Sequence, residues 1–250
     1  MTLFGEAAEL YVDARPGFPV TIADAIAAYA GPVAALVEIG AGTGKGTAVF
    51  HRLADHIVCL EPDPLMAAEL RRLFPDVEVR ATDFESWQPP PGGVPLLVGS
   101  LVWHWLDAAT RCARAHAALT PGGVLGIVGR SYAFADDDQR RIVEAAIVAT
   151  GWEGGGGPHD RWIAEDIAAS DLFDDVTVSR HDTSLALPTE DYLRLASTWS
   201  PFLRLPTDGR ERATVLLRDA VTACGGVVDL LLATTLTLAR RRATAPRGLV

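Results

Sequence analysis

The stretch "LVEIGAGTGKGTAVF", residues 36–50, carries glycine at every second position from 40 to 46, with a lysine and a threonine close behind. The apolar run that leads into it, residues 33–40, predicts a buried strand, and residues 45–54 predict a helix. A strand that enters a glycine-rich turn and leaves it as a helix is typical of several nucleotide-binding loops, because glycine lets the backbone approach a ligand closely. The stretch therefore predicts an α/β fold with a ligand at this loop.

The same alternation of strand and helix continues along the chain. Apolar or β-branched runs predict strands, and segments with apolar residues at helical spacing predict helices. We expect further strands at 56–62, 77–81, 95–103, 124–130, 176–187 and 227–241, helices at 65–74, 108–119, 136–150, 189–202 and 209–223, and a glycine-rich loop at 151–160. Such alternation implies right-handed crossovers and a Rossmann-like, doubly wound, mostly parallel sheet of seven strands.

The composition limits the partners. A net charge of −10 and a sequence pI near 5.0 argue against nucleic acid. Three widely spaced cysteines predict neither a disulfide framework nor a metal cluster, which fits a reducing cytoplasm. The sequence shows no recognisable signal peptide and no apolar run that reaches the length of a membrane span. We expect a cytoplasmic protein, monomeric or homodimeric, that needs no metal and does not bind membranes.

Two phosphate-binding loops fit the glycines poorly. The phosphate loop G-x-x-x-x-G-K-S/T requires glycine where Ile39 stands and a hydroxyl where Gly46 stands. The dinucleotide fingerprint G-x-G-x-x-G/A requires a small residue where Lys45 stands, and a lysine there obstructs close packing of helix against strand. A third possibility is a nucleoside without phosphate. Glu38 would repel a pyrophosphate at the helix N-terminus, but it suits a ligand with an ammonium or sulfonium charge.

The segment "EIGAGTGKGT" (38–47) resembles the acid-G-x-G-x-G loop of the class I methyltransferases that use S-adenosylmethionine (SAM), a cofactor with both charges. Glu61 follows the loop by about 20 residues, where a carboxylate can bind both ribose hydroxyls. Asp83 is placed for the adenine amino group, and Phe84 is placed to cover the ring. These parts occur in the order and spacing of that family, so the resemblance covers nearly the whole chain.

The resemblance implies an antiparallel last strand and a cofactor site, with S-adenosylhomocysteine (SAH) as the product. The segment "LTPGGVLGIV" (119–128) is similar to the one that the family places before its fifth strand. The cofactor-binding residues implied in this way are Glu38, Gly40, Ala41, Gly42, Gly44, Glu61, Pro62, Asp83, Phe84, Ser100 and Leu101.

Two further segments resemble a narrower group, the trans-aconitate and quinone-biosynthesis methyltransferases. "SLVWHWLD" (100–107) is similar to the A-x-x-x-H-W-x-D segment of that group, and "ELYVDARPGFP" (9–19) resembles its Y-x-x-x-R-P-x-Y-P. Val102 and Trp103 replace the residues common before the His-Trp pair, and Phe18 replaces the second tyrosine. The identity of the substrate is therefore not carried across.

His104 is the candidate catalytic residue, as a base or as a hydrogen-bond partner of the substrate. Methyl transfer disperses charge, so alignment and exclusion of water are the main tasks of the protein. Arg15 can meet an acidic substrate. The candidate substrate-binding residues are Tyr11, Arg15, Trp103, Trp105, Tyr192 and Trp199.

We predict a single domain over 1–250, with an N-terminal cap segment at 1–30 and a helical lid insert at 188–224, between the last two strands. The expected activity is SAM-dependent methyl transfer to a small molecule, on a carboxylate, a hydroxyl or an activated carbon. One alternative is a SAM-binding protein of the same fold without methyl transfer, such as a cyclase or a binding module. A second alternative is an NAD-dependent oxidoreductase, but Glu38 and Lys45 argue against it.

Overall fold

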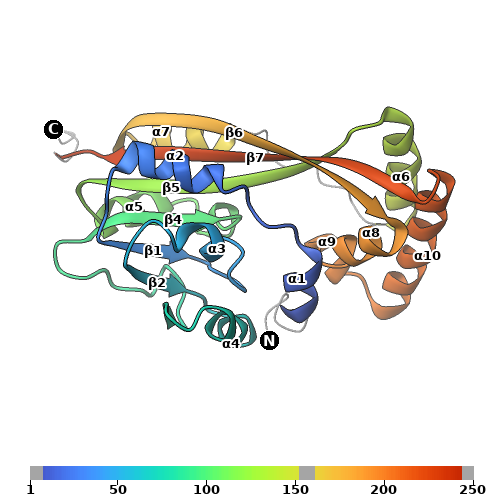
Figure 1. Cartoon of the computed structure of the whole chain (residues 1–250), viewed down its shortest axis with the longest axis horizontal. Coiled ribbons are helices and arrows are strands. Elements are labelled where there is room, and N and C mark those ends of the chain that lie inside the picture. Colours follow the sequence, from blue (N-terminus) through green and yellow to red (C-terminus); the bar gives the residue numbers. More distant parts are fainter. Residues whose placement is uncertain (1–7, 152–160, 244–250) are drawn as a thin grey trace. The chain divides into compact units, whose positions relative to one another are not determined.

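The computed structural model describes residues 8–151 and 161–243 of the chain (Figure 1). Their contacts group them into two compact units. The sheet unit takes its residues from Gly17–Arg130, Pro158–His181 and Thr234–Val250, and the helical unit takes them from Met1–Pro16, Ser131–Gly157 and Asp182–Ala233. Three long strands supply residues to both units.

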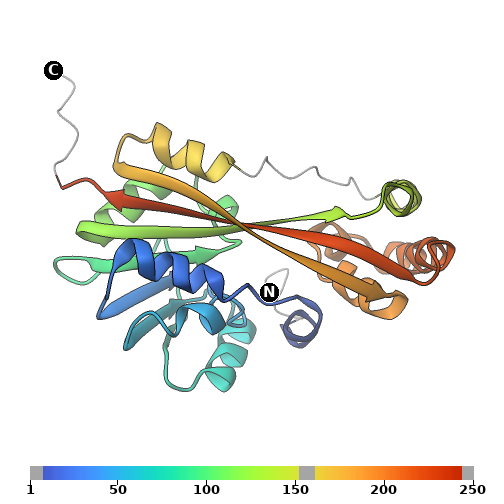
Figure 2. The same cartoon turned by 45° about the horizontal axis from the view of Figure 1, so that its top comes forward.

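A seven-stranded sheet runs in the order β3-β2-β1-β4-β5-β7-β6. Its strands are β1 (Ala35–Ile39), β2 (His56–Leu60), β3 (Glu78–Arg80), β4 (Val94–Ser100), β5 (Leu119–Phe134), β6 (Phe173–Pro188) and β7 (Val227–Arg241). The neighbours from β3 to β5 pair in parallel, whereas the arrowhead of β7 lies at the opposite end from those of β5 and β6 (Figure 2). The predicted Rossmann-like fold, mostly parallel with an antiparallel last strand, is confirmed.

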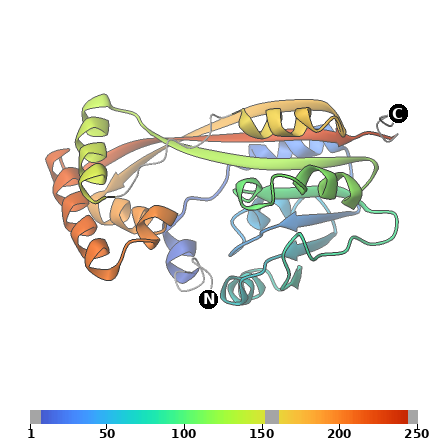
Figure 3. The ribbon, with the colours of Figure 1, turned by 180° about the vertical axis from the view of Figure 1, so that it is seen from behind.

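Helices cover both faces of the sheet in the sheet unit. They are α2 (Thr21–Ala30), α3 (Thr47–Phe50), α4 (Pro64–Leu73), α5 (Arg111–Ala118) and α7 (Trp162–Ala169), with the short 3-10 helix η2 (Trp103–Trp105). α2 and α3 lie in front of the sheet in Figure 1, and α5 and α7 lie in front when it is seen from behind in Figure 3. Consecutive strand residues point to opposite faces, so β1 sends Leu36 to the α2 side and Val37 to the α5 side. Strands covered on both faces are continuously apolar for this reason.

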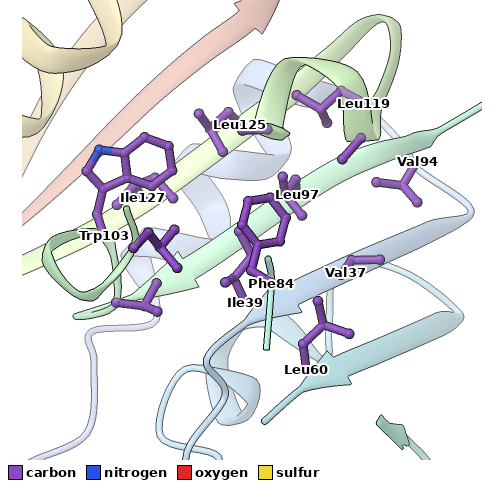
Figure 4. Packing of buried hydrophobic residues seen from close by; sticks show 14 of the residues in the cluster. Val37, Ile39, Leu60, Phe84, Val94, Leu97, Trp103, Leu119, Leu125 and Ile127 are labelled. Atoms are coloured by element: carbon purple, nitrogen blue, oxygen red, sulfur yellow. The ribbon is translucent and has the colours of Figure 1, made fainter. Parts of the chain in front are cut away.

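The core on the α5 side contains residues of six strands, and Figure 4 shows those of β1, β2, β4 and β5. Val37 and Ile39 of β1 pack there with Leu60 of β2, Leu97 of β4 and Leu125 and Ile127 of β5. Phe84 and Trp103, from the loops that follow β3 and β4, close the same cluster. Burying a large apolar side chain stabilises the fold by about 1.5–3 kcal/mol, so this cluster fixes the loops as well as the strands.

The described helices of the helical unit are α1 (Ala8–Ala14), α6 (Asp137–Ala149), α8 (Thr189–Ala196), α9 (Ser200–Leu203) and α10 (Thr207–Ala223). α6 begins at a side-chain cap, because Asp136 accepts hydrogen bonds from the amides of Asp138 and Gln139 at 2.9 and 2.8 Å. The core of this unit is built from α8, α10 and the adjoining part of β7, and includes Tyr192 and Leu217.

Several element boundaries differ from the prediction. The helix expected at 45–54 is reduced to α3, because the glycine loop continues to Gly46 and a turn follows Phe50. β4 ends at Ser100, three residues before the predicted strand end, because Leu101 has a φ of 54°. β5 starts at Leu119, so the Pro-Gly-Gly segment forms its first part. α7 was not predicted. The loop predicted at 151–160 lies, from 152 onward, outside the described residues.

Candidate functional site

The order of the sheet reverses between β1 and β4, and the two loops that follow these strands start there. Ile39, the last residue of β1, lies beside Gly99 near the end of β4. In a parallel sheet, ligands bind outside the carboxyl ends of the strands at such a switch point. The loops also touch, because a Cβ on Gly40 would stand 2.5 Å from Cγ2 of Val102. With its φ of 59°, Gly40 is therefore required for both its conformation and its lack of a side chain.

The glycine loop directs three of its amides into the protein. The amide of Ala41 donates to the carbonyl of Leu60 at 3.0 Å, and the amide of Gly44 donates to the carbonyl of Ala41 at 3.0 Å. The amide of Gly42 donates to Oε2 of Glu61 at 2.7 Å. A loop that binds phosphate points such amides at the ligand. The observed bonds therefore favour a ligand without phosphate.

Glu61 connects the end of β2 to the glycine loop. Besides the bond to Gly42, its Oε1 accepts a hydrogen bond from the amide of Asp63 at 2.8 Å. Burial raises the pKa of Glu61, although the amides of Asp63 and Gly42 act in the opposite direction. Asp63 in turn caps α4 by accepting from the amides of Leu65 and Met66, and Pro62 between the two acids is exposed. The carboxylate predicted to bind ribose is thus held in place by the backbone.

Glu38 lies beneath the glycine loop with no exposed surface. The hydroxyl of Thr47 donates to its Oε2 at 2.6 Å, whereas Oε1 has no hydrogen-bond partner among the described residues. Burial raises the pKa of Glu38 to about 8, and the nearby Glu61 adds to the effect. A Cβ on Gly46 would overlap Oε1 of Glu38 and the hydroxyl of Ser100. Gly46 is therefore a glycine that the close packing of these two polar groups requires.

Asp83 and Phe84 have different surroundings, although they are adjacent. Asp83 is exposed, and its Oδ1 accepts from the amide of Ser86 at 2.6 Å. Phe84 is buried and stacks on Trp87, with 6.2 Å between the ring centroids. Asp83 thus presents a carboxylate at the surface, while the ring of Phe84 belongs to the core in this structure (Figure 4).

The turn after β4 presents His104 and Trp105 outward and Trp103 inward. Trp105 is 51% exposed, and its ring lies 5.2 Å from that of His104, centroid to centroid. Trp103 is 1% exposed and packs in the core. Desolvation of the ring and the nearby Arg111 guanidinium lower the pKa of His104, so this imidazole is neutral at pH 7. The structure therefore separates the two tryptophans that the sequence analysis grouped together.

The other candidate residues belong to the helical unit. The guanidinium of Arg15 donates to the hydroxyl of Thr198 at 2.7 Å and to its carbonyl at 3.0 Å. Tyr192 is fully buried, and burial raises the pKa of its hydroxyl, which has no hydrogen-bond partner among the described residues. Trp199 lies with its ring centroid 6.2 Å from that of Tyr192 and 5.7 Å from that of Tyr132. Tyr11 is a residue of α1.

Sequence reasoning missed Tyr132, Arg111 and Asp166. Tyr132 lies in β5 and its buried hydroxyl has no partner in the described part of the chain. Arg111 and Asp166 form an ion pair between α5 and α7, with 2.7 Å between Nη2 and Oδ1. No local pattern marks these residues, since their partners are distant in sequence. Within residues 8–151 and 161–243, no group of acidic, histidine or cysteine side chains is arranged to hold a metal ion, and no helix there is long and apolar enough to cross a membrane.

Comparison with known proteins gives similar sequences that are methyltransferases by name. Residues 36–123 match a family described as a methyltransferase domain. An uncharacterised methyltransferase of Mycobacterium tuberculosis (strain H37Rv) is 31% identical over 50% of this chain and 51% of its own, so the match spans about half the length of that relative. An uncharacterised methyltransferase-like protein of Schizosaccharomyces pombe is 25% identical over 81% of this chain and 79% of its own.

Solved structures share the fold at low sequence identity. A proposed type II methyltransferase of Anaeromyxobacter dehalogenans superposes with a TM-score of 0.70 at 16% identity, over 92% of this chain and 99% of the other. A phosphoethanolamine N-methyltransferase of Haemonchus contortus, in complex with SAH, superposes with a TM-score of 0.55 at 14% identity. The superposition covers 95% of this chain and 57% of the other. The structure of a cyclase superposes with a TM-score of 0.56 at 12% identity, over 97% of this chain and 95% of the other. At these identities the likeness shows a common fold.

Proposed function

We propose, from the match of residues 36–123 to a methyltransferase domain family, that the chain transfers a methyl group from SAM to a small-molecule acceptor. The observation that carries the proposal is the glycine loop, which bonds three of its amides within the protein and lies over two buried carboxyl groups, Glu38 and Glu61. Such a loop disfavours a pyrophosphate and suits a nucleoside with a cationic end.

The residues present fit SAM. Gly42, with a φ of 58°, leaves room at the loop, because the nearest atom to a Cβ there would be Sδ of Met66 at 3.9 Å, whereas Gly40 and Gly46 let the loop pack on Val102 and Glu38. Oε1 of Glu38 is a buried acceptor without a partner in the described chain, and each carboxylate oxygen of Glu61 can accept a further hydrogen bond from a ribose. Asp83 at the surface is available for the adenine amino group. When bound, the cofactor supplies a methyl group on a sulfonium.

His104 is the residue that we propose to face the acceptor. Its imidazole is neutral at pH 7, because desolvation and Arg111 lower its pKa, so it can accept a proton or a hydrogen bond from an acceptor hydroxyl. Trp105 beside it can shield the reacting atoms from water. Trp103 has its place in the core, where it anchors the turn that carries His104.

The helical unit is proposed to select the acceptor. Tyr192 and Trp199 form an aromatic cluster with a buried hydroxyl, which suits an acceptor with an apolar body and one polar group. Arg15, from the segment before the sheet, is proposed to recognise a carboxylate, and Tyr11 of the same segment, whose side chain lies outside the described part, is a proposed contact of the acceptor. Together with the "SLVWHWLD" turn, they support kinship with the trans-aconitate and quinone-biosynthesis methyltransferases. The three free cysteines support the proposed cytoplasmic location.

Calorimetry with SAH and NAD, and mass spectrometry for SAH production from SAM, test the proposal. We expect SAH to bind and NAD not to bind. Glu61→Gln should weaken SAH by about 2 kcal/mol, roughly thirtyfold, because a charged acceptor is lost, whereas the exposed Glu78→Gln serves as the matched control. Binding of NAD in place of SAH would overturn the proposal.

A second function, catalysis of a cyclisation without methyl transfer, is favoured by one observation, the shared fold with a cyclase at a TM-score of 0.56. The two functions differ in one product. Methyl transfer produces SAH in proportion to turnover, whereas a cyclase that binds SAM leaves it intact. His104→Gln should lower kcat by about a hundredfold in a methyltransferase that uses this base. Turnover of a substrate without SAH would favour the cyclase.

A further inference from the structure

The turn after β4 is tied to two helices by a small polar cluster that the proposed methyl transfer does not by itself explain. Its members are Trp103 in the turn, Arg111 on α5 and Asp166 on α7. Nε1 of Trp103 donates to Oδ2 of Asp166 at 2.7 Å. Nε and Nη2 of Arg111 donate to Oδ2 and Oδ1 of the same carboxylate at 2.8 and 2.7 Å. Such a bidentate pair is geometrically specific as well as strong.

Arg111 also holds the backbone of the turn. Its Nη1 donates to the carbonyl of Trp103 at 3.2 Å, next to the peptide that leads into His104. The guanidinium carbon lies 5.6 Å from the ring centroid of Trp103 and 5.3 Å from that of Trp162. Three of the five N–H donors of Arg111 take part in these bonds, and two indole rings lie near its guanidinium, so the guanidinium has little freedom.

The turn needs this support because its backbone is strained. Leu101 has a φ of 54°, a conformation that costs an ordinary residue roughly 1–2 kcal/mol, and its amide donates to the carbonyl of Val128 at 2.9 Å. Val102, the next residue, packs against Gly40 of the glycine loop. The turn is therefore in contact with the cluster through Trp103 and with the glycine loop through Val102.

We propose that Asp166, acting through Arg111 and Trp103, is the positioning residue of the turn 101–105 and controls the charge beside His104. It fixes the turn by accepting from both partners, and it balances the positive charge of Arg111. Burial acts to raise the pKa of Asp166, but the hydrogen bonds of Arg111 and Trp103 lower it overall, so the carboxylate is charged at pH 7. This inference rests on the proposed function in one respect only, namely that His104 takes part in catalysis.

Other charged groups around the turn have hydrogen-bond partners outside the cluster. The carboxylate of Asp107 lies in the turn before α5 and accepts from the amide of Ala109 at 3.0 Å and from the hydroxyl of Thr110 at 2.9 Å. Oε1 of Glu85 accepts from the amide of Asp107 at 3.4 Å. Besides desolvation of the ring, the Arg111 guanidinium lowers the pKa of His104, and Asp166 forms an ion pair with this guanidinium.

Two variants with opposite charge effects test the proposal, read by NMR titration of the His104 ring in the full chain without acceptor. Arg111→Gln removes a positive charge, so the pKa of His104 should rise. Asp166→Asn leaves Arg111 unbalanced, so the pKa of His104 should fall. The signal is assigned with His104→Gln. A merely structural role would move both titrations in the same direction or neither, and either result would overturn the proposal.

A second measurement on the unaltered protein remains available if a variant fails to fold. The indole N–H of Trp103 should exchange with solvent at least a hundredfold more slowly than that of Trp105, which is 51% exposed and serves as the internal control. Equal exchange rates would show that the bond to Asp166 is not formed in solution. Binding of SAH is measured separately, so failure of the proposed function and failure of this inference give different results.

Discussion

Glu38 in the sheet unit and Tyr192 in the helical unit are both fully buried, and each has an oxygen without a hydrogen-bond partner in the described chain. Their surroundings differ. Glu38 lies among polar groups, with Thr47 on one oxygen and Cys59 and Glu61 nearby. Tyr192 lies in an aromatic and aliphatic core. The difference indicates that the first region is a polar cluster beneath the glycine loop, whereas the second is an apolar core that leaves one hydroxyl without a bond in the described chain.

The largest effect that would sharpen this comparison is expected for Gly46→Ala. The φ of Gly46 is −72°, which suits alanine, so the added methyl group acts only by overlapping Glu38 and Ser100. We expect the free energy of unfolding to fall by about 3 kcal/mol and SAH binding to be lost. Gly17→Ala, where a Cβ meets nothing within 4 Å, is the matched control in urea unfolding. Equal stability of the two variants would show that the loop is loosely packed.

The next effect is a pH dependence that Glu38 imposes. Its pKa is about 8 in the folded protein against an ordinary value of 4.5, so the folded state binds the extra proton between these values. The contribution of Glu38 to the free energy of unfolding should therefore be greatest below pH 4.5. It should fall as the pH rises to 8, by up to about 1.4 kcal/mol per pH unit. Urea titrations of the natural protein and of Glu38→Gln, which lacks this slope, measure the difference. Parallel pH profiles would contradict a buried, protonated Glu38.

A smaller loss is expected for Thr47→Val. The change keeps the shape of the side chain but removes the hydroxyl that donates to Oε2 of Glu38 at 2.6 Å. A buried carboxyl group then loses its hydrogen bond, so the free energy of unfolding should fall by about 1–3 kcal/mol. Thr214→Val on α10 is the control, because its exposed hydroxyl bonds only to the carbonyl of Arg210 within its own helix. Equal losses of unfolding free energy at the two positions would show that the hydrogen bond to Glu38 does not stabilise the buried carboxyl group.

The smallest effect, and the one of opposite sign, is expected for Tyr192→Phe. Removal of a buried hydroxyl without a partner should leave the free energy of unfolding unchanged or raise it by about 1 kcal/mol. The KM for an acceptor should nevertheless rise if the hydroxyl contacts it. Tyr29→Phe, which removes a hydroxyl that donates to the carbonyl of Asp175 at 2.8 Å, is the matched control. A clear loss of stability in Tyr192→Phe would indicate a bond within the folded protein.

The sequence by itself determined the Rossmann-like sheet of seven strands and the place of the glycine loop after its first strand. These follow from local patterns: apolar runs of strand length, glycines at fixed spacing, and a carboxylate at the end of each of the first two strands. It also placed His104 at a loop beyond β4. The predicted element boundaries differ from the structure where one residue changes the backbone. At Leu101, for example, a positive φ ends β4 before the predicted strand end.

Only the tertiary structure decided what each side chain does at these places. It buried Glu38 completely, bonded Glu61 to the loop that it follows, and turned Trp103 into the core beside Arg111 and Asp166. The last of these outcomes depends on α7, which lies more than fifty residues away in the chain and carries no local sign of its partner. Burial and charge pairing are sums over neighbours from distant segments, so no window of sequence contains them.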